Sequence, residues 1–162
     1  MLCADGGGTA TGLRGAVSAY NHDPVYVSTV LVLSLAFADD AGVDATVVAA
    51  LTYAASQLGV PYRWGGTGPG GFDCSGLSQA AFAHAGVSLP RVAQDQFDAG
   101  PTVTAAQPSA GDLLFFGSGP GGVDHVGIYA GDGLMVDAPH TGAVVRVEAA
   151  DWSGLVGATR PG

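Results

Sequence analysis

Residues 60–78 read VPYRWGGTGPGGFDCSGLS, a stretch that joins a dense run of turn-forming residues to the start of a helix. Glycine and proline dominate the part over 60–72, and both favour turns for definite backbone reasons. We therefore interpret 60–72 as an ordered loop. A helix is predicted over 74–84, with Asp73 available to cap its start and Gly86 to end it.

A second helix precedes this loop, and strands follow the 74–84 helix. Asp44 is a candidate N-cap for a helix over 45–58, where apolar residues recur at helical spacing. Residues 91–100 are expected to form a short helix or turn. The pattern then becomes strand-like, with short Gly- and Asp-containing loops between predicted strands at 112–117, 125–130, 134–138 and 144–147. This order predicts an α+β fold, with helices packed on a mostly antiparallel sheet.

The N-terminal part is predicted to be a separate helical segment. Apolar spacing indicates a short helix over 12–20 and a buried helix within 25–38. The 25–38 stretch is as long as the apolar part of a signal peptide, but no basic segment precedes it and it is too short to span a bilayer. We place a boundary near Gly42, dividing the chain into a helical extension over 1–42 and a domain over 43–162.

Composition argues against several classes of function. The chain has 14 acidic and 5 basic residues and a net charge of −9, so it lacks the clustered cations that nucleic-acid binding requires. Its two cysteines, Cys3 and Cys74, do not have the paired spacing of a zinc site, and their settings differ enough that we expect separate roles. We expect no metal and no cofactor.

Cys74 and His125 are the candidate reactive pair. Cys74 stands at the predicted start of a helix, where unpaired N–H groups and the helix dipole favour a thiolate. The alternative is a buried structural cysteine. His125 opens a predicted strand and could take the thiol proton, the alternative being a surface histidine.

The residue that would orient the imidazole depends on one turn. If residues 131–133 all lie in the loop between two strands, His125 and Asp137 share a face of the sheet. If only 132–133 form the turn, His125 pairs with His140 instead. The sequence is compatible with both registers.

Taken in order, the motifs VPYRWGG, FDCSGL, AGDLLFF, DHVGIYAGDG and VDAPHTG resemble the NlpC/P60 family of papain-like cysteine peptidases over about residues 44–160. The resemblance implies a papain-like α+β fold and cleavage of bacterial cell-wall stem peptides, typically between D-γ-glutamyl and meso-diaminopimelate. Peptidoglycan stem peptides are thus the expected partner, and we expect a monomer. A wall substrate also implies a secreted or wall-associated protein, although no export signal is visible in this chain.

The resemblance also assigns site residues. The nucleophile of FDCSG falls on Cys74, the base of DHVGIY on His125, and the third polar position on Asp137, where the family often has histidine. His140 is the fallback for that third position. Tyr62 is expected near the cysteine, either to polarise the scissile carbonyl or simply to pack the loop.

In similar proteins, the Asp and Ser that flank the cysteine can help to hold the amino end of the peptide. The resemblance therefore makes Asp73 and Ser75 candidate binding residues. Asp73 would cap the helix in either case. Arg63 and Trp64 are candidate groove residues, and Trp64 could equally belong to the core.

A second resemblance concerns the first 42 residues, in which LCADGGG and LRGAVSAYNHDPVYVSTVL are similar to the end of a lytic transglycosylase domain. The catalytic glutamate of that family lies upstream, and Glu148 is the only glutamate here, so we infer no transglycosylase activity. The alternative is a simple helical extension. For the Cys–His site, acyl transfer or another amidase reaction and an idle wall-binding module stay open beside the endopeptidase.

Overall fold

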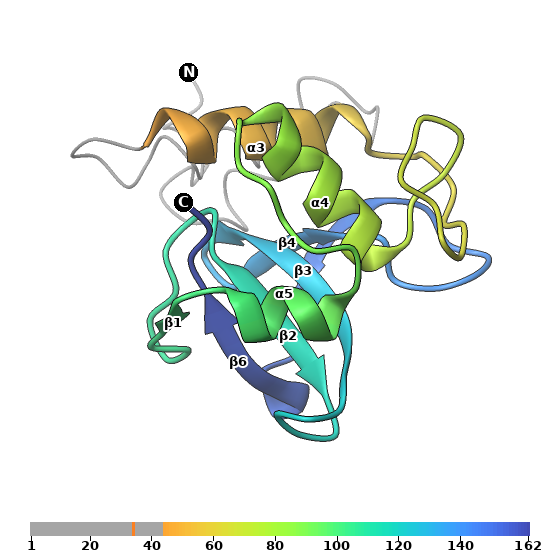
Figure 1. The fold of residues 1–162 in the computed structure, drawn as a ribbon. Helices are drawn as coiled ribbons and strands as arrows, with labels where there is room; N and C mark the ends of the chain where they lie inside the picture. Colours follow the sequence, from red (N-terminus) through yellow and green to blue (C-terminus); the bar gives the residue numbers. More distant parts are fainter. Residues whose placement is uncertain (1–33, 35–43) are drawn as a thin grey trace, which may run out of the picture.

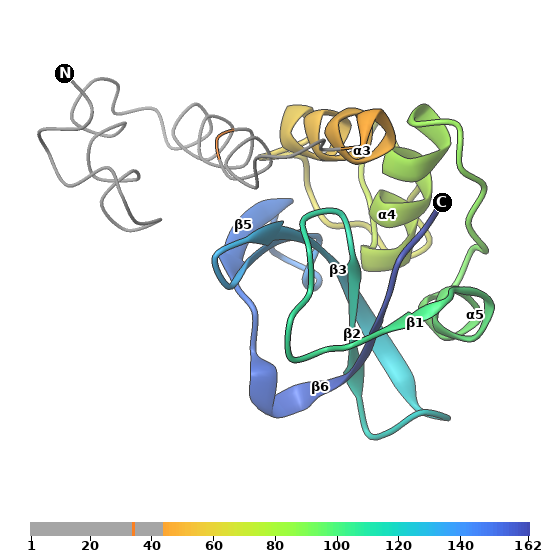
Figure 2. The ribbon, with the colours of Figure 1, turned by 90° about the vertical axis from the view of Figure 1, so that its left-hand side faces the viewer.

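The computed structural model describes Ser34 and residues 44–162. The helix predicted over 12–20, the helix predicted over 25–38 apart from Ser34, the boundary near Gly42, and Cys3 lie outside the described residues. In the described part, helices lie on one face of a curved six-stranded sheet (Figure 1, Figure 2). None of the helices described there is long and apolar enough to cross a membrane.

Three predicted helical segments are helices, namely α3 (Ala45–Ser56), α4 (Cys74–His84) and α5 (Ala93–Ala99). Asp44 caps α3 by accepting a hydrogen bond of 2.9 Å from the backbone N–H of Thr46. α3 ends two residues earlier than predicted, because the chain leaves the helix in a turn that reaches Gly59 at φ +85°.

The sheet is antiparallel at every junction between its strands, in the order β1-β6-β2-β3-β4-β5. Its strands are β1 (Thr102–Val103), β2 (Leu113–Gly117), β3 (Val123–Gly131), β4 (Leu134–Asp137), β5 (Arg146–Ala149) and β6 (Leu155–Thr159). The α+β fold is confirmed, with the helices on an antiparallel sheet.

One predicted strand has different limits, and two strands were missed. The pattern over 144–147 predicted a strand that actually begins at Arg146, because Val144 instead forms an isolated bridge with Pro61 in the loop before α4. The short strand β1 and the C-terminal strand β6 were not predicted. β6 lies between β1 and β2, so β1 is the edge strand on that side of the sheet.

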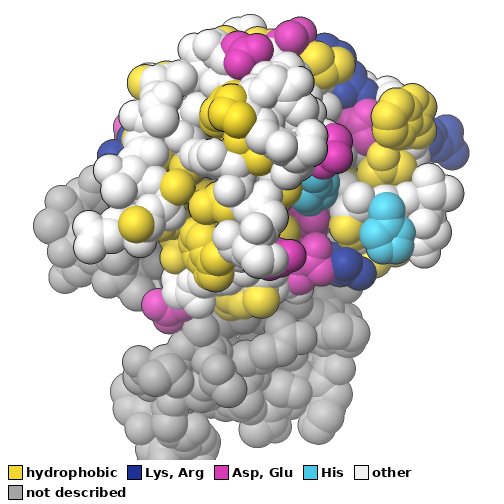
Figure 3. All heavy atoms as spheres, turned by 90° about the horizontal axis from the view of Figure 1, so that it is seen from below, with side chains coloured by type: hydrophobic (Ala, Val, Ile, Leu, Met, Phe, Trp, Pro, Cys, Tyr) yellow, Lys and Arg dark blue, Asp and Glu magenta, His cyan; other side chains and the backbone are white. Residues whose placement is uncertain are grey.

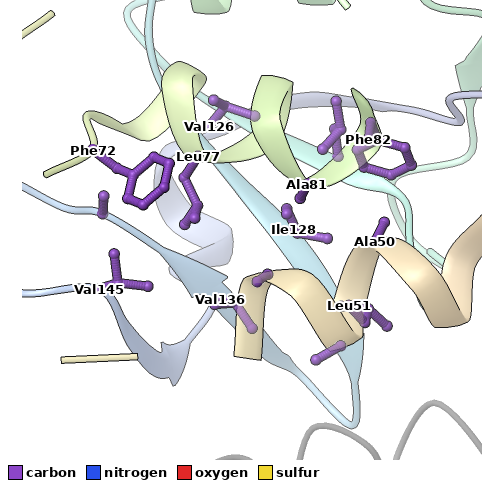
Figure 4. Packing of buried hydrophobic residues seen from close by; sticks show 14 of the residues in the cluster. Ala50, Leu51, Phe72, Leu77, Ala81, Phe82, Val126, Ile128, Val136 and Val145 are labelled. Carbon is purple, nitrogen blue, oxygen red and sulfur yellow. The ribbon is translucent and has the colours of Figure 1, made fainter. Parts of the chain in front are cut away.

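The main core fills the space between the helices and the sheet (Figure 4). Its largest fully buried side chains include Phe72, Phe82, Phe115, Leu51 and Leu77. A smaller apolar cluster on the opposite face of the sheet contains Leu114, Phe116, Tyr129, Met135, Ala150 and Ala158. The strands therefore alternate between two apolar layers, which fixes their register.

Candidate active site

Cys74 is the first residue of α4, and its position depends on close backbone contact with the preceding loop. Asp73 caps the helix by accepting a hydrogen bond of 2.7 Å from the N–H of Gly76. The backbone N–H of Asp73 donates to the carbonyl of Gly66 at 3.1 Å. A Cβ on Gly76 would lie 2.0 Å from that same carbonyl oxygen, so only glycine fits. The spacing of RWGG and DCSG thus reflects a loop held against the first turn of α4.

His125 lies in β3, and a bulge in that strand decides which side chain it meets. Asp132 and Gly133 form a two-residue turn with positive φ values of 51° and 75°, as type I′ hairpins require. The register then shifts by one residue between Tyr129 and Gly131. Tyr129 accordingly pairs with Met135 in β4.

This shift places His125 and Asp137 on the same face of the sheet. The turn is the two-residue form, and the bulge restores the register expected for the three-residue loop. Each of the two alternatives was therefore right in one respect only: the turn has two residues, but His125 and Asp137 share a face as expected for the three-residue loop. Of the two registers left open by the sequence, the structure has the one that brings His125 to Asp137 and not the one that pairs His125 with His140. His140 is exposed, and its Nδ1 lies 3.0 Å from the Thr141 carbonyl oxygen.

The imidazole of His125 is bonded to a fully buried carboxylate. Its Nε2 atom lies 2.8 Å from Oδ2 of Asp137, whose exposed fraction is 0%. Burial alone lowers the pKa of His125, but hydrogen bonds with Asp137 and Cys74 and the charges of both residues raise it to about 10. The ring is therefore protonated at neutral pH and interacts with the sulfur at the start of α4.

Arg146 and Glu148 lie beside Asp137 on the neighbouring strand. Arg146 pairs with Asp137 in the β4–β5 register, and its guanidinium forms an ion pair with Glu148. Burial raises the pKa of Glu148, and so do the charge of Asp137 and a hydrogen bond with it, whereas Arg146 opposes the rise. Asp137 is thus surrounded by charged groups on two strands.

Tyr62 belongs to the same site as Cys74. Its ring packs against the main core, and its backbone N–H donates to the Ala143 carbonyl at 2.9 Å. Burial raises the pKa of the phenol, as do the charges of Cys74 and Asp73, while Arg91 lowers it. The hydroxyl therefore stays protonated at neutral pH and can donate a hydrogen bond.

Arg91 is a residue of this site that the sequence analysis did not single out. Its Nη2 donates to Asp73 Oδ2 at 2.7 Å, and its Nη1 donates at 3.0 Å both to Asp73 Oδ1 and to Ser75 Oγ. Arg91 therefore contacts both residues that flank Cys74. The only local signal was its place directly after Pro90, which gives no hint of a partner eighteen residues upstream.

Trp64 is not a core residue, because 86% of its surface is exposed. Arg63, its neighbour in the loop, is also exposed. A separate hollow of about 400 Å³ is lined by residues that include His125, Pro139, His140, Arg146 and Glu148. Histidine side chains beside acidic and basic ones are visible on the face seen from below (Figure 3).

On this α+β architecture, a cysteine at a helix start together with a histidine held by a strand carboxylate defines the papain-like class of domain. The chain belongs to the NlpC/P60 family, whose model matches residues 59–156.

Relatives and solved structures are consistent with this membership. The peptidoglycan endopeptidase RipB of Mycobacterium tuberculosis is 44% identical over 115 residues, which are 63% of this chain and 47% of RipB. RipA of the same species is 41% identical over 113 residues, or 62% of this chain and 24% of RipA. The chain thus spans less than half the length of these curated relatives.

Among solved structures, RipA mutated at a cysteine aligns with a TM-score of 0.67 and 35% identity, covering 72% of this chain and 62% of that one. An NlpC/P60 family protein from Bacillus cereus aligns with a TM-score of 0.67 and 32% identity, covering 70% of this chain and 39% of that one. Further matched RipA structures carry mutations at a histidine and at a glutamate.

Proposed function

We propose that residues 44–162 form the catalytic domain of a cysteine endopeptidase that acts on peptidoglycan stem peptides. The observation that carries this proposal is the coupling of Cys74, at the N-terminus of α4, to His125, which is bonded to buried Asp137. The names of RipA and RipB as peptidoglycan endopeptidases support the choice of substrate.

The spacing of the pair supports Asp137 as the orienting residue. The histidine and glutamate mutated in the RipA structures are twelve positions apart in that protein, the same separation as between His125 and Asp137. Both acidic side chains can accept the imidazole N–H. Asp137 fixes the ring and stabilises its protonated form, as carboxylates do in other nucleophile–histidine sites.

Acylation uses the Cys74 sulfur as the nucleophile and His125 as the proton donor. The Cys74 thiolate attacks the scissile carbonyl carbon, so a C–S bond forms and negative charge moves to the oxygen. The N–H at the start of α4 and the Tyr62 hydroxyl stabilise that oxygen. When the intermediate collapses the C–N bond breaks, and the His125 imidazolium gives its proton to the departing amine.

Deacylation restores the site. Water adds to the thioester and gives one proton to neutral His125, so a C–O bond forms. The C–S bond then breaks, leaving the acid product and the Cys74 thiolate beside a protonated imidazole. In this scheme the chain's own residues carry every proton that moves.

The bond that we propose is the one between D-γ-glutamyl and meso-diaminopimelate, because the motifs around Cys74 and His125 resemble those of the family that cleaves it. A wall substrate places the enzyme outside the cytoplasmic membrane or in the wall. We further propose that it acts there as a monomer.

A synthetic L-Ala-γ-D-Glu-meso-diaminopimelate peptide in ¹⁸O-labelled water tests the reaction. Mass spectrometry should find free diaminopimelate and one ¹⁸O in the new glutamyl carboxylate. Transfer of the glutamyl group to an added amine without ¹⁸O would show an acyltransferase instead. Absence of any product, with reactive Cys74 and folded protein, would contradict the endopeptidase and favour a wall-binding module.

A further inference from the structure

The hollow beside His125 is built by neighbouring strands on one face of the sheet. His125 lies opposite Phe116 in the β2–β3 register, and Glu148 lies opposite Met135 in the β4–β5 register. Arg146 is two residues before Glu148 on β5. Directly opposed residues, and residues two apart on one strand, share a face of an antiparallel sheet. These five side chains accordingly belong to the lining of one hollow of about 400 Å³.

This hollow combines buried apolar side chains with exposed charges of both signs. Phe116 and Met135 are buried. The guanidinium of Arg146, whose side chain is 43% exposed, forms an ion pair with the carboxylate of Glu148. Acidic and basic side chains lie together beside histidine on the face seen from below (Figure 3). Such a lining fits an aliphatic chain that ends in both an ammonium and a carboxylate.

Arg146 retains donors that the fold does not use. Arg91 and Arg160 each donate through two N–H groups to one buried carboxylate. The guanidinium of Arg146 instead meets only the half-buried Glu148, through its Nη2, and its buried Nε has no hydrogen-bond partner within residues 44–162. Because a guanidinium carries five N–H donors, Arg146 can still bind a carboxylate of a ligand.

His125 determines which part of the substrate lies nearest this hollow. In the proposed reaction its imidazolium gives a proton to the leaving amine, so that nitrogen must come within hydrogen-bond reach of the ring. The residue that owns the nitrogen then lies against His125, which itself lines the hollow. In diaminopimelate, the side chain of that residue is a short run of methylenes that ends in an ammonium and a carboxylate.

We propose that the hollow beside His125 binds the side chain of the leaving residue, and that Arg146 is a specificity-determining residue that pairs with its distal carboxylate while Glu148 contacts its distal ammonium. This inference rests on the proposed endopeptidase function. The methylenes would lie over Phe116 and Met135. A leaving residue whose distal carboxylate is converted to a carboxamide keeps its shape but loses the charge that Arg146 binds.

The wild-type protein tests the proposal without any variant. Two peptides are compared, L-Ala-γ-D-Glu-meso-diaminopimelate and the same peptide with its distal carboxylate amidated. The acid should have a kcat/KM about tenfold higher, the size of one charge-assisted hydrogen bond, and the difference should lie mainly in KM. A difference of less than threefold, or a preference for the amide, would overturn the inference and leave the endopeptidase intact. Cleavage of neither peptide would instead contradict the proposed function.

Variants show whether Arg146 is the cause. Arg146→Ala should bring the ratio of the two kcat/KM values close to one, chiefly by weakening the acid. The ratio is taken within each variant, so a general loss of activity through Asp137, which lies opposite Arg146, does not affect it. The matched control is Arg160→Ala, which removes an arginine in a different part of the fold and should keep the wild-type ratio. An unchanged ratio in folded Arg146→Ala, or an equal fall in Arg160→Ala, would show that Arg146 does not set the preference.

A third peptide tests the part assigned to Glu148. Its leaving residue is 2-aminopimelate, which keeps the distal carboxylate and lacks the distal ammonium. The wild type should prefer diaminopimelate over this residue by about threefold, as expected for a partly exposed ion pair. Glu148→Gln should remove that preference. Equal kcat/KM values in the wild type, or a preference that survives in Glu148→Gln, would overturn the assignment of Glu148.

Discussion

The Nε2 atom of His125 lies 2.8 Å from Oδ2 of Asp137, a carboxylate with no exposed surface. This contact exists because a one-residue bulge in β3 compensates for the tight turn at Asp132 and Gly133. Without the bulge, Asp137 would lie on the other face of the sheet from His125. The chemistry of the site therefore depends on one irregularity between Tyr129 and Gly131.

His125 should titrate far above an ordinary histidine. Burial lowers the pKa, but Asp137 and Cys74 raise it to about 10. We expect ¹⁵N NMR of the ring to show a protonated imidazole at pH 7, and Asp137→Asn to bring the pKa down because the carboxylate charge is lost. A wild-type value near 6.5 would rule out the buried imidazolium.

The same shift gives stability a defined pH dependence. Because the pKa of His125 is raised on folding, its contribution to the free energy of unfolding is fully present below about pH 6.5 and is lost as the pH rises through about 10. Denaturant unfolding from pH 6 to pH 10 should show this loss in the wild type and a smaller one in His125→Ala. Parallel curves for the two proteins would contradict the assignment.

The two histidines near the site should differ in their importance. His125→Ala removes the proposed acid and base, so kcat should fall by roughly a thousandfold. His140 is exposed and its ring contacts the Thr141 carbonyl, so His140→Ala should change kcat by less than about threefold. Kinetics with the tripeptide measure both. A larger loss in His140→Ala would make His140 the functional histidine partner.

The contact between the loop and α4 should be intolerant of a single methyl group. A Cβ on Gly76 would come within 2.0 Å of the Gly66 carbonyl oxygen, so Gly76→Ala should lower the free energy of unfolding by about 1–3 kcal/mol. A Cβ on Gly121 would meet nothing within 4 Å, so Gly121→Ala serves as the control. Equal stabilities in urea denaturation would show that this close approach is not required.

Local sequence signals predicted the parts of the fold that depend on neighbouring residues. Helix α4 was expected over 74–84 and has these limits, because Asp73 caps its start within three residues of sequence. The assignment of Asp137 required the family resemblance. Spacing alone left two registers open, and a bulge has no signal in the alternation of apolar residues.

Contacts between distant segments were not predictable in this way. Arg91 has its partners on α4, and nothing in its own segment indicates them. Strand β6 pairs with β2 across about forty residues of sequence, for example Leu155 with Phe116 and Thr159 with Leu113. Its sequence includes glycine and small residues, so its pairing depends on the assembled sheet and not on local propensity.

Digestion of purified peptidoglycan by wild type and by Cys74→Ala, followed by mass spectrometry of the muropeptides, tests the central claim most directly. The wild type should cut between D-glutamyl and diaminopimelate, and the variant, folded to the same stability, should produce no such fragments. Equal cleavage by both proteins would contradict Cys74 as the nucleophile. Cleavage at a different bond by the wild type alone would keep the nucleophile and overturn the proposed substrate bond.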